Sequence, residues 1–418
     1  MKKFSFMLML FALAAAHAQQ MKMHGESPTF IETIQRHTFS GTSSEPNSTP
    51  TPMLMNTRGD WMMMVHGEAF VADTQQSSPR GGDKFFSTNW LMPMAQRNWG
   101  ARELTLRAMF SLEPATITGR EYPLLFQQGE TAYGNPIADG QHPHNFLMEL
   151  AALYDWQVAS DVLLSFYAAP VGDPAIGPTA YPHRMSASED PVAALGHHQE
   201  DSTHIADDVV TVGLTKGVVR LEASGFHGRE PNEQRWEVQQ GAMDSWSTRL
   251  TLQPGQNWSG QYSYALIHSP EQLFPDENQR RMTTSVMYNR PFSQGNWTSS
   301  LLWGRTRESG GSVVQNSYLL ESLVRFGSKN YAFTRMENVD RTTGLLLGQR
   351  PFPPGFEEKP AGRVQAYTFG YDRDFDAIQH VESALGAQVT TYGVGSRLQP
   401  VYGSDPVGVT AFLRLRLR

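Results

Sequence analysis

The chain has 418 residues, a net charge of −7, a pI near 6.0 and no cysteine. The lack of cysteine excludes disulfide staples and thiolate metal sites. The acidic balance argues against nucleic acid as a partner, because such proteins present a basic surface.

The first twenty residues, "MKKFSFMLMLFALAAAHAQQ", have the order of a secretory signal. Lys2 and Lys3 precede an apolar run over residues 4–16, and Ala16-His17-Ala18 forms an A-x-A cleavage site. The apolar run is shorter than the roughly 20 residues that a membrane-spanning helix needs. We therefore predict a cleaved signal peptide over residues 1–18 and an exported protein.

Residues 19–59 are rich in Ser, Thr and Pro, and they show no periodicity in "HTFSGTSSEPNSTPTPMLM". This composition predicts a flexible periplasmic arm, which also carries methionines. From residue 60 onward the pattern changes to an alternation of apolar and polar residues.

The segment "RELTLRAMFSLEP", residues 102–114, shows this alternation clearly. Leu104 and Leu106 fall on one face, and Thr105 and Arg107 fall on the other. Its length suits a tilted membrane-spanning strand, about 9–11 residues. We predict sixteen such strands, near residues 60–72, 88–97, 102–113, 146–155, 161–170, 207–215, 218–227, 243–252, 259–267, 281–289, 296–305, 314–326, 330–338, 363–373, 380–392 and 407–417.

The joins between these strands alternate in length. Short turns such as "TKGV", "QPGQN" and "FSQG" alternate with long joins, most clearly at residues 114–145, 171–206, 228–242, 339–362 and 393–406. Short turns at one end and long loops at the other are typical of outer-membrane barrels. The sequence therefore predicts an all-β, antiparallel, up-and-down transmembrane barrel over residues 60–418. We expect about sixteen strands (14–18), in the outer membrane of a Gram-negative-type cell. Tryptophans near strand ends, Trp90 and Trp99 among them, fit an aromatic girdle.

The polar face of the strands carries charges of both signs. We predict that the lumen is lined by Arg107, Arg220, Glu222, Arg249, Arg414 and Arg416. A water-filled pore needs such mixed charge, which predicts a channel for a small solute or ion. The alternative is that these residues pair across the interior and close it.

Histidines and carboxylates gather in two consecutive long loops and the strand that follows. The candidate metal ligands are His142, His144, His183, His197, His198, His204, His227, Asp201 and Asp207. Imidazole with carboxylate suits Zn²⁺, Cu²⁺ or Ni²⁺. The same groups suit a pH-sensitive gate, because histidine titrates near pH 6.5. A simple polar loop is the third interpretation.

Methionines form a second candidate site. In "GDWMMMVHGEAF", an inward face would carry Met62, Met64 and His66, and the next strand would add Met92 and Met94 if the two pair. Thioether and imidazole ligands suit copper, especially Cu(I). The other interpretation is apolar packing, since methionine fills irregular gaps.

The signal peptide, the segment "MKMHG" at residues 21–25 and the barrel together resemble the outer-membrane copper-resistance protein B family. That resemblance implies a copper-handling role as the alternative function, with copper or zinc as the bound ion. The long Met-x-x-Met repeats of that family are missing, so the resemblance assigns no individual ligand. A third hypothesis is a barrel-embedded hydrolase with a Ser–His pair. No G-x-S-x-G elbow supports it.

Overall fold

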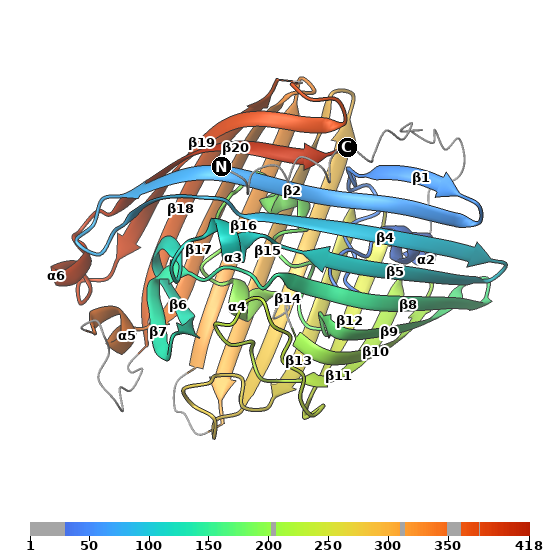
Figure 1. The fold of residues 1–418 in the computed structure, drawn as a ribbon, viewed down its shortest axis with the longest axis horizontal. Helices are drawn as coiled ribbons and strands as arrows, with labels where there is room; N and C mark the ends of the chain where they lie inside the picture. Colours follow the sequence, from blue (N-terminus) through green and yellow to red (C-terminus); the bar gives the residue numbers. More distant parts are fainter. Residues whose placement is uncertain (1–29, 202–205, 310–313, 349–360, 376) are drawn as a thin grey trace, which may run out of the picture.

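The structure is a computed structural model that describes residues 30–201, 206–309, 314–348, 361–375 and 377–418. Across these residues the chain forms a closed antiparallel up-and-down β-barrel of sixteen strands (Figure 1). The strands are β2 (Trp61–Gln76), β3 (Asp83–Phe86), β4 (Asn89–Trp99), β5 (Arg102–Phe110), β8 (Leu147–Ala159), β9 (Val162–Gly172), β10 (Ala206–Lys216), β11 (Val219–His227), β12 (Ser245–Gly255), β13 (Trp258–Ile267), β14 (Gln279–Phe292), β15 (Gly295–Glu308), β16 (Val314–Phe326), β17 (Asn330–Thr342), β18 (Ala361–Asp374), β19 (Val381–Val394) and β20 (Val407–Leu417). Here β3 and β4 count as one interrupted strand, because both pair with the same side of β2.

The barrel closes between its first and last strands. On one side, β2 pairs with β20 in a register that sets Ala72 opposite Phe412. Beyond the end of β20, the short strand β1 (Leu54–Arg58) continues along β2. On its other side, β2 pairs with β4 and β3. The described sheet is therefore a ring, and closure removes the exposed strand edges that invite aggregation.

All sixteen predicted strands are confirmed as strands of the barrel, with bounds that differ by a few residues. The prediction missed β1, β3 and a separate hairpin of β6 (Tyr122–Ala132) and β7 (Asn135–Gln141) inside the first long loop. These elements escaped because they are very short or, like "PLLF" in β6, lack alternation. Short helical segments lie in the arm and long loops: α2 (Phe30–Arg36), α3 (Glu113–Thr116), η2 (Met185–Ala187), α4 (His197–Glu200), α5 (Thr343–Leu347) and α6 (Gln399–Tyr402).

The outside of the wall is apolar and the inside is polar. Leu106 on the outer face is 44% exposed, whereas its neighbour Arg107 is 2% exposed in the interior. Outward tryptophans such as Trp99 and Trp258 lie at strand ends, as a membrane girdle requires. Trp90 was wrongly assigned to this girdle. It shares the inward face of β4 with Met92 and packs on His66. Among the described helices, none has the length and apolar character to cross a membrane.

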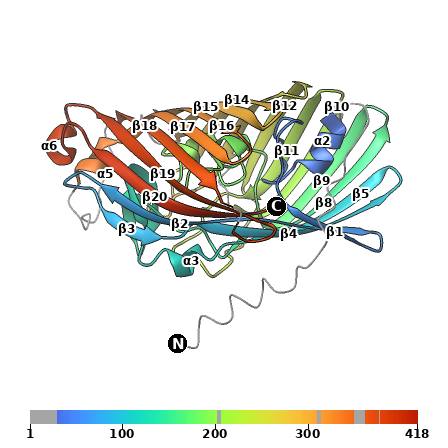
Figure 2. The ribbon, with the colours of Figure 1, turned by 90° about the horizontal axis from the view of Figure 1, so that it is seen from above.

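Three described segments fill the barrel interior: the arm from residue 30 to about residue 50, the long loop 173–201, and the β6–β7 hairpin with its flanks (Figures 1 and 2). Nearly every residue of loop 173–201 is buried. The hairpin packs through Tyr122, whose ring stacks on Phe86 at 4.5 Å, and through Phe126, whose ring stacks on Tyr402 at 4.4 Å.

The described arm differs from the flexible segment that its composition predicts. Ile31 and Ile34 of α2 pack on Leu163, an inward residue of β9. Further along, Ser48 and Asn289 of β14 join arm to wall, with Asn289 Nδ2 donating to the Ser48 carbonyl at 2.6 Å. A Ser/Thr-rich segment cannot build a core of its own, but its hydroxyls and backbone can satisfy a polar lumen wall.

Candidate functional site

Inward charges of the wall pair with one another. Arg107 Nε lies 2.5 Å from Glu149 Oε2, and both side chains are buried. Glu222 forms ion pairs with two arginines, Arg220 at 3.0 Å and Arg249 at 2.9 Å. These are residues that the sequence places in the lumen. They form neutralised pairs along the wall, within one strand or between neighbouring strands.

The arm accepts further hydrogen bonds from arginines of this wall. Arg107 Nη2 donates to the Gly41 carbonyl at 2.7 Å, and Arg249 Nη2 donates to Thr42 Oγ1 at 2.8 Å. Ser40 Oγ donates to Asp173 Oδ2 at 2.8 Å, at the start of the long loop. The arm therefore joins wall and loop in one hydrogen-bonded assembly.

Loop 173–201 is held to the opposite wall by buried ion pairs. Arg184 of the loop lies 2.8 Å from Glu321 of β16 and 3.4 Å from Asp201, and its side chain has no exposed area. Arg335 of β17 lies 3.0 Å from Glu321 and 2.8 Å from Asp190 of the loop. One wall carboxylate thus connects a loop arginine and a wall arginine.

A second anchor joins the same loop to the last strand. Glu189 lies 2.5 Å from Arg414 and 2.9 Å from Arg416, both on β20. Arg416 also pairs with Glu68 of β2 at 2.6 Å. Burial alone would raise the pKa of Glu189, but the two guanidinium groups outweigh it and hold that pKa below its usual value. Glu189 is therefore charged, and it joins the long loop to β20, the strand that closes the barrel against β2.

Asp201 behaves differently from Glu189. Burial raises its pKa to about 7, and the Arg184 guanidinium offsets only part of that effect. At neutral pH this loop carboxyl is close to half protonated. The loop therefore contains a group whose charge changes in the physiological range.

The predicted histidine set separates into groups. His142, His144, His197 and His198 gather where β7 meets α4, with the His142 and His198 rings 5.8 Å apart and the His197 and His198 rings 3.9 Å apart. Protein groups already engage these rings, and His142 Nδ1 lies 2.8 Å from the Pro143 carbonyl. His144 Nδ1 lies 2.9 Å from Glu113 Oε2, and His197 Nε2 lies 3.0 Å from Gln141 Oε1.

The other members of the set lie elsewhere. His227 and Asp207 face each other across β10 and β11, and His227 lies 3.5 Å from Asp244. His183 lies against the methionines, and His204 falls outside the described residues. Within the described ranges, no three His, Asp or Glu side chains are arranged to hold a metal ion.

The predicted methionine group does come together. Met64 pairs with Met94 and His66 pairs with Met92 across β2 and β4. All four are at least nine-tenths buried on the inward face, while Met63 between them is 43% exposed on the outside. Met62 packs at the edge of the same cluster. The strand register that brings these side chains together is the one the alternation predicts.

The structure adds members that the sequence analysis did not assign to this site. Met109 of β5 and Met148 of β8 are both 4% exposed in the cluster, and Met53, Met55 and Phe39 of the arm pack there. His183 from the long loop places its Nε2 3.3 Å from Met109 Sδ. The alternation around Arg107 already implied that Met109 points inward. The position of His183 depends on the loop fold.

The two histidines of this cluster are unusual. The His66 and His183 rings lie 6.0 Å apart, each in edge contact with Trp90, and the Nδ1 atom of each is buried without a hydrogen-bond partner among the described residues. Burial, with smaller contributions from His66 and Arg107, holds the pKa of His183 well below its usual value. A neutral imidazole beside thioethers is a soft, uncharged donor set.

In sequence, no protein-family model and no curated protein matches this chain. Solved structures match in fold. An anion-selective porin from Comamonas acidovorans superposes with a TM-score of 0.52 at 10% identity, over 85% of this chain and 100% of that one. Outer-membrane porin OmpF of Salmonella typhi gives 0.49 at 8% identity over 86% and 100%, and the DcaP channel of Acinetobacter baumannii gives 0.45 at 9% over 86% and 99%. The match to the Comamonas acidovorans porin shows that the chain has the porin-like outer-membrane barrel fold.

Proposed function

We propose that this protein is a gated outer-membrane channel for a small solute or ion, with a lumen that is closed at rest. The observation that carries the proposal is the way in which loop 173–201 and the arm fill a porin-like barrel through polar contacts. When a segment moves away, water can hydrate the charged groups of buried ion pairs such as Arg184–Glu321. An apolar core would resist such a release. The porin-like fold favours a channel over a hydrolase.

Conductance in a planar bilayer tests this proposal. We expect the refolded barrel to be mostly closed with brief openings, and a variant that lacks residues 30–50 to conduct far more. Heat-modifiable migration on a gel would show that both barrels are folded. Silence of both proteins at every voltage would contradict a channel, and a permanently open wild type would contradict closure at rest.

A second candidate function, the handling of copper as Cu(I), is favoured by the methionine–histidine cluster. Donors that share one metal ion at about 2.0–2.3 Å lie roughly 3.5 Å apart. The 3.3 Å between His183 Nε2 and Met109 Sδ fits that geometry. Cu(I) prefers thioether and imidazole ligands, and Met92 and Met94 lie in the same cluster. A channel with this site in its wall would pass or retain a soft metal ion.

Competition with a chromophoric Cu(I) chelator tests the second function. Met94→Leu and Met109→Leu keep the volume and apolar character of the cluster and remove the sulfur. We expect Cu(I) affinity to fall at least tenfold in each, and to stay unchanged in Met63→Leu on the outer face. Equal affinity in all four proteins would show that the methionines only pack.

The hypothesis of a Cu²⁺ or Zn²⁺ site in the long loops stands as a separate proposal. Its support is the proximity of His142, from the first long loop, to His197 and His198 of α4 in the second. Calorimetric titration of the barrel, beside a variant with His197 and His198 changed to Ala, would detect it. Heat of binding that the variant retains would assign the ion to another site.

A further inference from the structure

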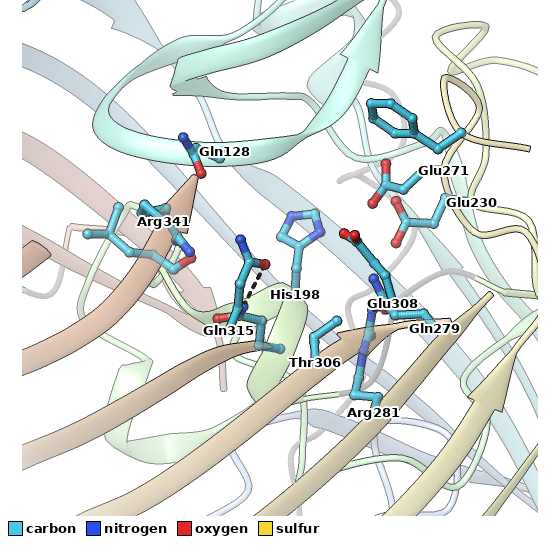
Figure 3. Close-up of a pocket in the computed structure, with 13 residues that line it drawn as sticks. Gln128, His198, Glu230, Glu271, Gln279, Arg281, Thr306, Glu308, Gln315 and Arg341 are labelled. Carbon is cyan, nitrogen blue, oxygen red and sulfur yellow. Dashed lines mark hydrogen bonds between the residues drawn. The ribbon is translucent and has the colours of Figure 1, made fainter. Parts of the chain in front are cut away.

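A cavity of about 70 Å³ lies at the long-loop end of the barrel, between α4, β6 and the wall strands β14–β16 (Figure 3). It is separate from the methionine–histidine cluster, which lies on the wall of β2, β4 and β5. For scale, a dry protein cavity of roughly 150 Å³ holds benzene. This cavity therefore has room for a molecule of a few heavy atoms.

Arg281 of β14 gives the cavity its chemistry. Its side chain points into the cavity from the wall, and the residue is only 3% exposed. A guanidinium group has five N–H donors. Nη2 donates to Gln279 Oε1 at 2.9 Å, but Nε and Nη1 have no acceptor within the described residues. A buried cation with unmatched donors is costly unless another oxygen acceptor completes it.

Carboxylates on other walls of the cavity carry the opposite charge. Glu308 comes from the end of β15, and Glu230 and Glu271 come from two neighbouring long loops (Figure 3). None of the three accepts a hydrogen bond from Arg281 Nε or Nη1. The cavity therefore presents Arg281 and several carboxylates to the same small space, and His198 of α4 and Arg341 of β17 also belong to its lining.

We propose that this cavity is an entry site for a small zwitterion of the amino-acid type. The carboxylate of the solute would complete the donors of Arg281, because charge-assisted hydrogen bonds to guanidinium are strong. Its ammonium group would lie toward Glu308 and Glu271. The three glutamates would repel a simple anion, and Arg281 would repel a simple cation. A solute that carries both charges therefore fits best.

The proposal deepens the proposed function, since it names the class of solute that a channel would admit. Its position supports this role: the cavity lies against His198 and Gln199 of the loop that fills the lumen, at the ends of β14 and β15 that join the long loops. Rings or pairs of charge at a constriction are the usual means by which pores select their solutes.

Saturation-transfer NMR of the full mature barrel in deuterated detergent tests the site. The probes are glycine, acetate and methylammonium. We expect glycine to bind best, to weaken at least tenfold in Arg281→Gln and Glu308→Gln, and to be unaffected by Arg307→Gln. Arg307 is the matched control, because it is exposed on the outer face of β15 and its loss changes the net charge equally.

The outcomes separate this site from the channel itself. Equal glycine binding in the wild type and Arg281→Gln, or no binding of any probe, would overturn the site. Acetate binding as well as glycine would make it an anion site and overturn the zwitterion. Glycine binding by a barrel that never conducts would leave the site and remove the channel. Conductance without glycine binding would overturn the site and leave the channel.

Discussion

Replacement of Glu321 by glutamine is a direct perturbation of the closed lumen. Glu321 Oε2 accepts from Arg184 Nε at 2.8 Å and from Ser186 Oγ at 3.0 Å, and Oε1 accepts from Arg335 Nε at 3.0 Å. The residue is 1% exposed. Glutamine keeps the size of the side chain but removes its charge and one of its two acceptor oxygens.

The size of the effect follows from where the unpaired charges go. Removing one partner of a buried ion pair costs about 3–5 kcal/mol. Arg335 stays in the wall in both states and keeps Asp190 when the loop is docked, at 2.8 Å. Arg184 leaves with the loop, so the part of the cost that falls on the docked state alone is about 2 kcal/mol. Since 1.4 kcal/mol is tenfold, the ratio of open to closed barrels should rise roughly 30-fold.

Single-channel recording measures that ratio as the fraction of time open. Asp60→Asn is the control, because Asp60 forms an exposed pair with Arg97 whose loss costs at most about 1 kcal/mol. We expect frequent openings in Glu321→Gln and wild-type behaviour in the control. A folded Glu321→Gln barrel that stays as closed as the wild type would refute the reasoning, as would equal opening by Asp60→Asn.

Three further results are expected. A disulfide between Ser48→Cys and Asn289→Cys should keep the arm in the lumen, so that openings appear only after reduction. Leu106→Arg should impair membrane insertion by about 2–4 kcal/mol, and Arg107→Leu should impair it less, since only Leu106 faces lipid. The pKa of Asp201 is about 7 in the docked loop and takes its ordinary value of 3.8 when the loop is released. The docked loop therefore binds more protons, and closure should weaken as pH rises from 3.8 to about 7. Asp201→Asn should remove that dependence.

Each of these results has a check. For the disulfide, a cross-link between Thr368→Cys and Thr390→Cys, whose hydroxyls lie 2.8 Å apart on paired strands of the wall, should leave opening unchanged. Folding yield in lipid vesicles measures the insertion pair, and a larger defect in Arg107→Leu would reverse the assigned register. For Asp201, open probability between pH 5 and 8 is the measurement. Binding of one proton changes the ratio of open to closed barrels by at most tenfold per pH unit. An equal pH dependence in Asp201→Asn would show that another group binds the proton.

The wall of the barrel could be predicted because its physical causes are local. Alternation in "RELTLRAMF" fixes which side chains face lipid, and Gly-containing turns such as "TKGV" fix the register of the strands they join. The same alternation predicted that Met64 and Met94 would point inward, and pairing of consecutive strands then placed them side by side. The local pattern was sufficient wherever strands that pair in the barrel are also consecutive in the sequence.

The contents of the lumen could not be predicted in this way. Loop 173–201 and the arm have no periodicity, and their positions depend on pairs such as Arg184 with Glu321, 137 residues apart, and Ser48 with Asn289, 241 residues apart. The arm has the composition of a flexible segment, and it is ordered by a polar wall that its own sequence does not contain. The sequence by itself therefore determined a barrel with a polar, charged interior and an inward methionine face. Only the tertiary structure decided that the charges pair, that the interior is filled, and that His183 joins the methionines, because each of these depends on long-range contacts within an enclosed space.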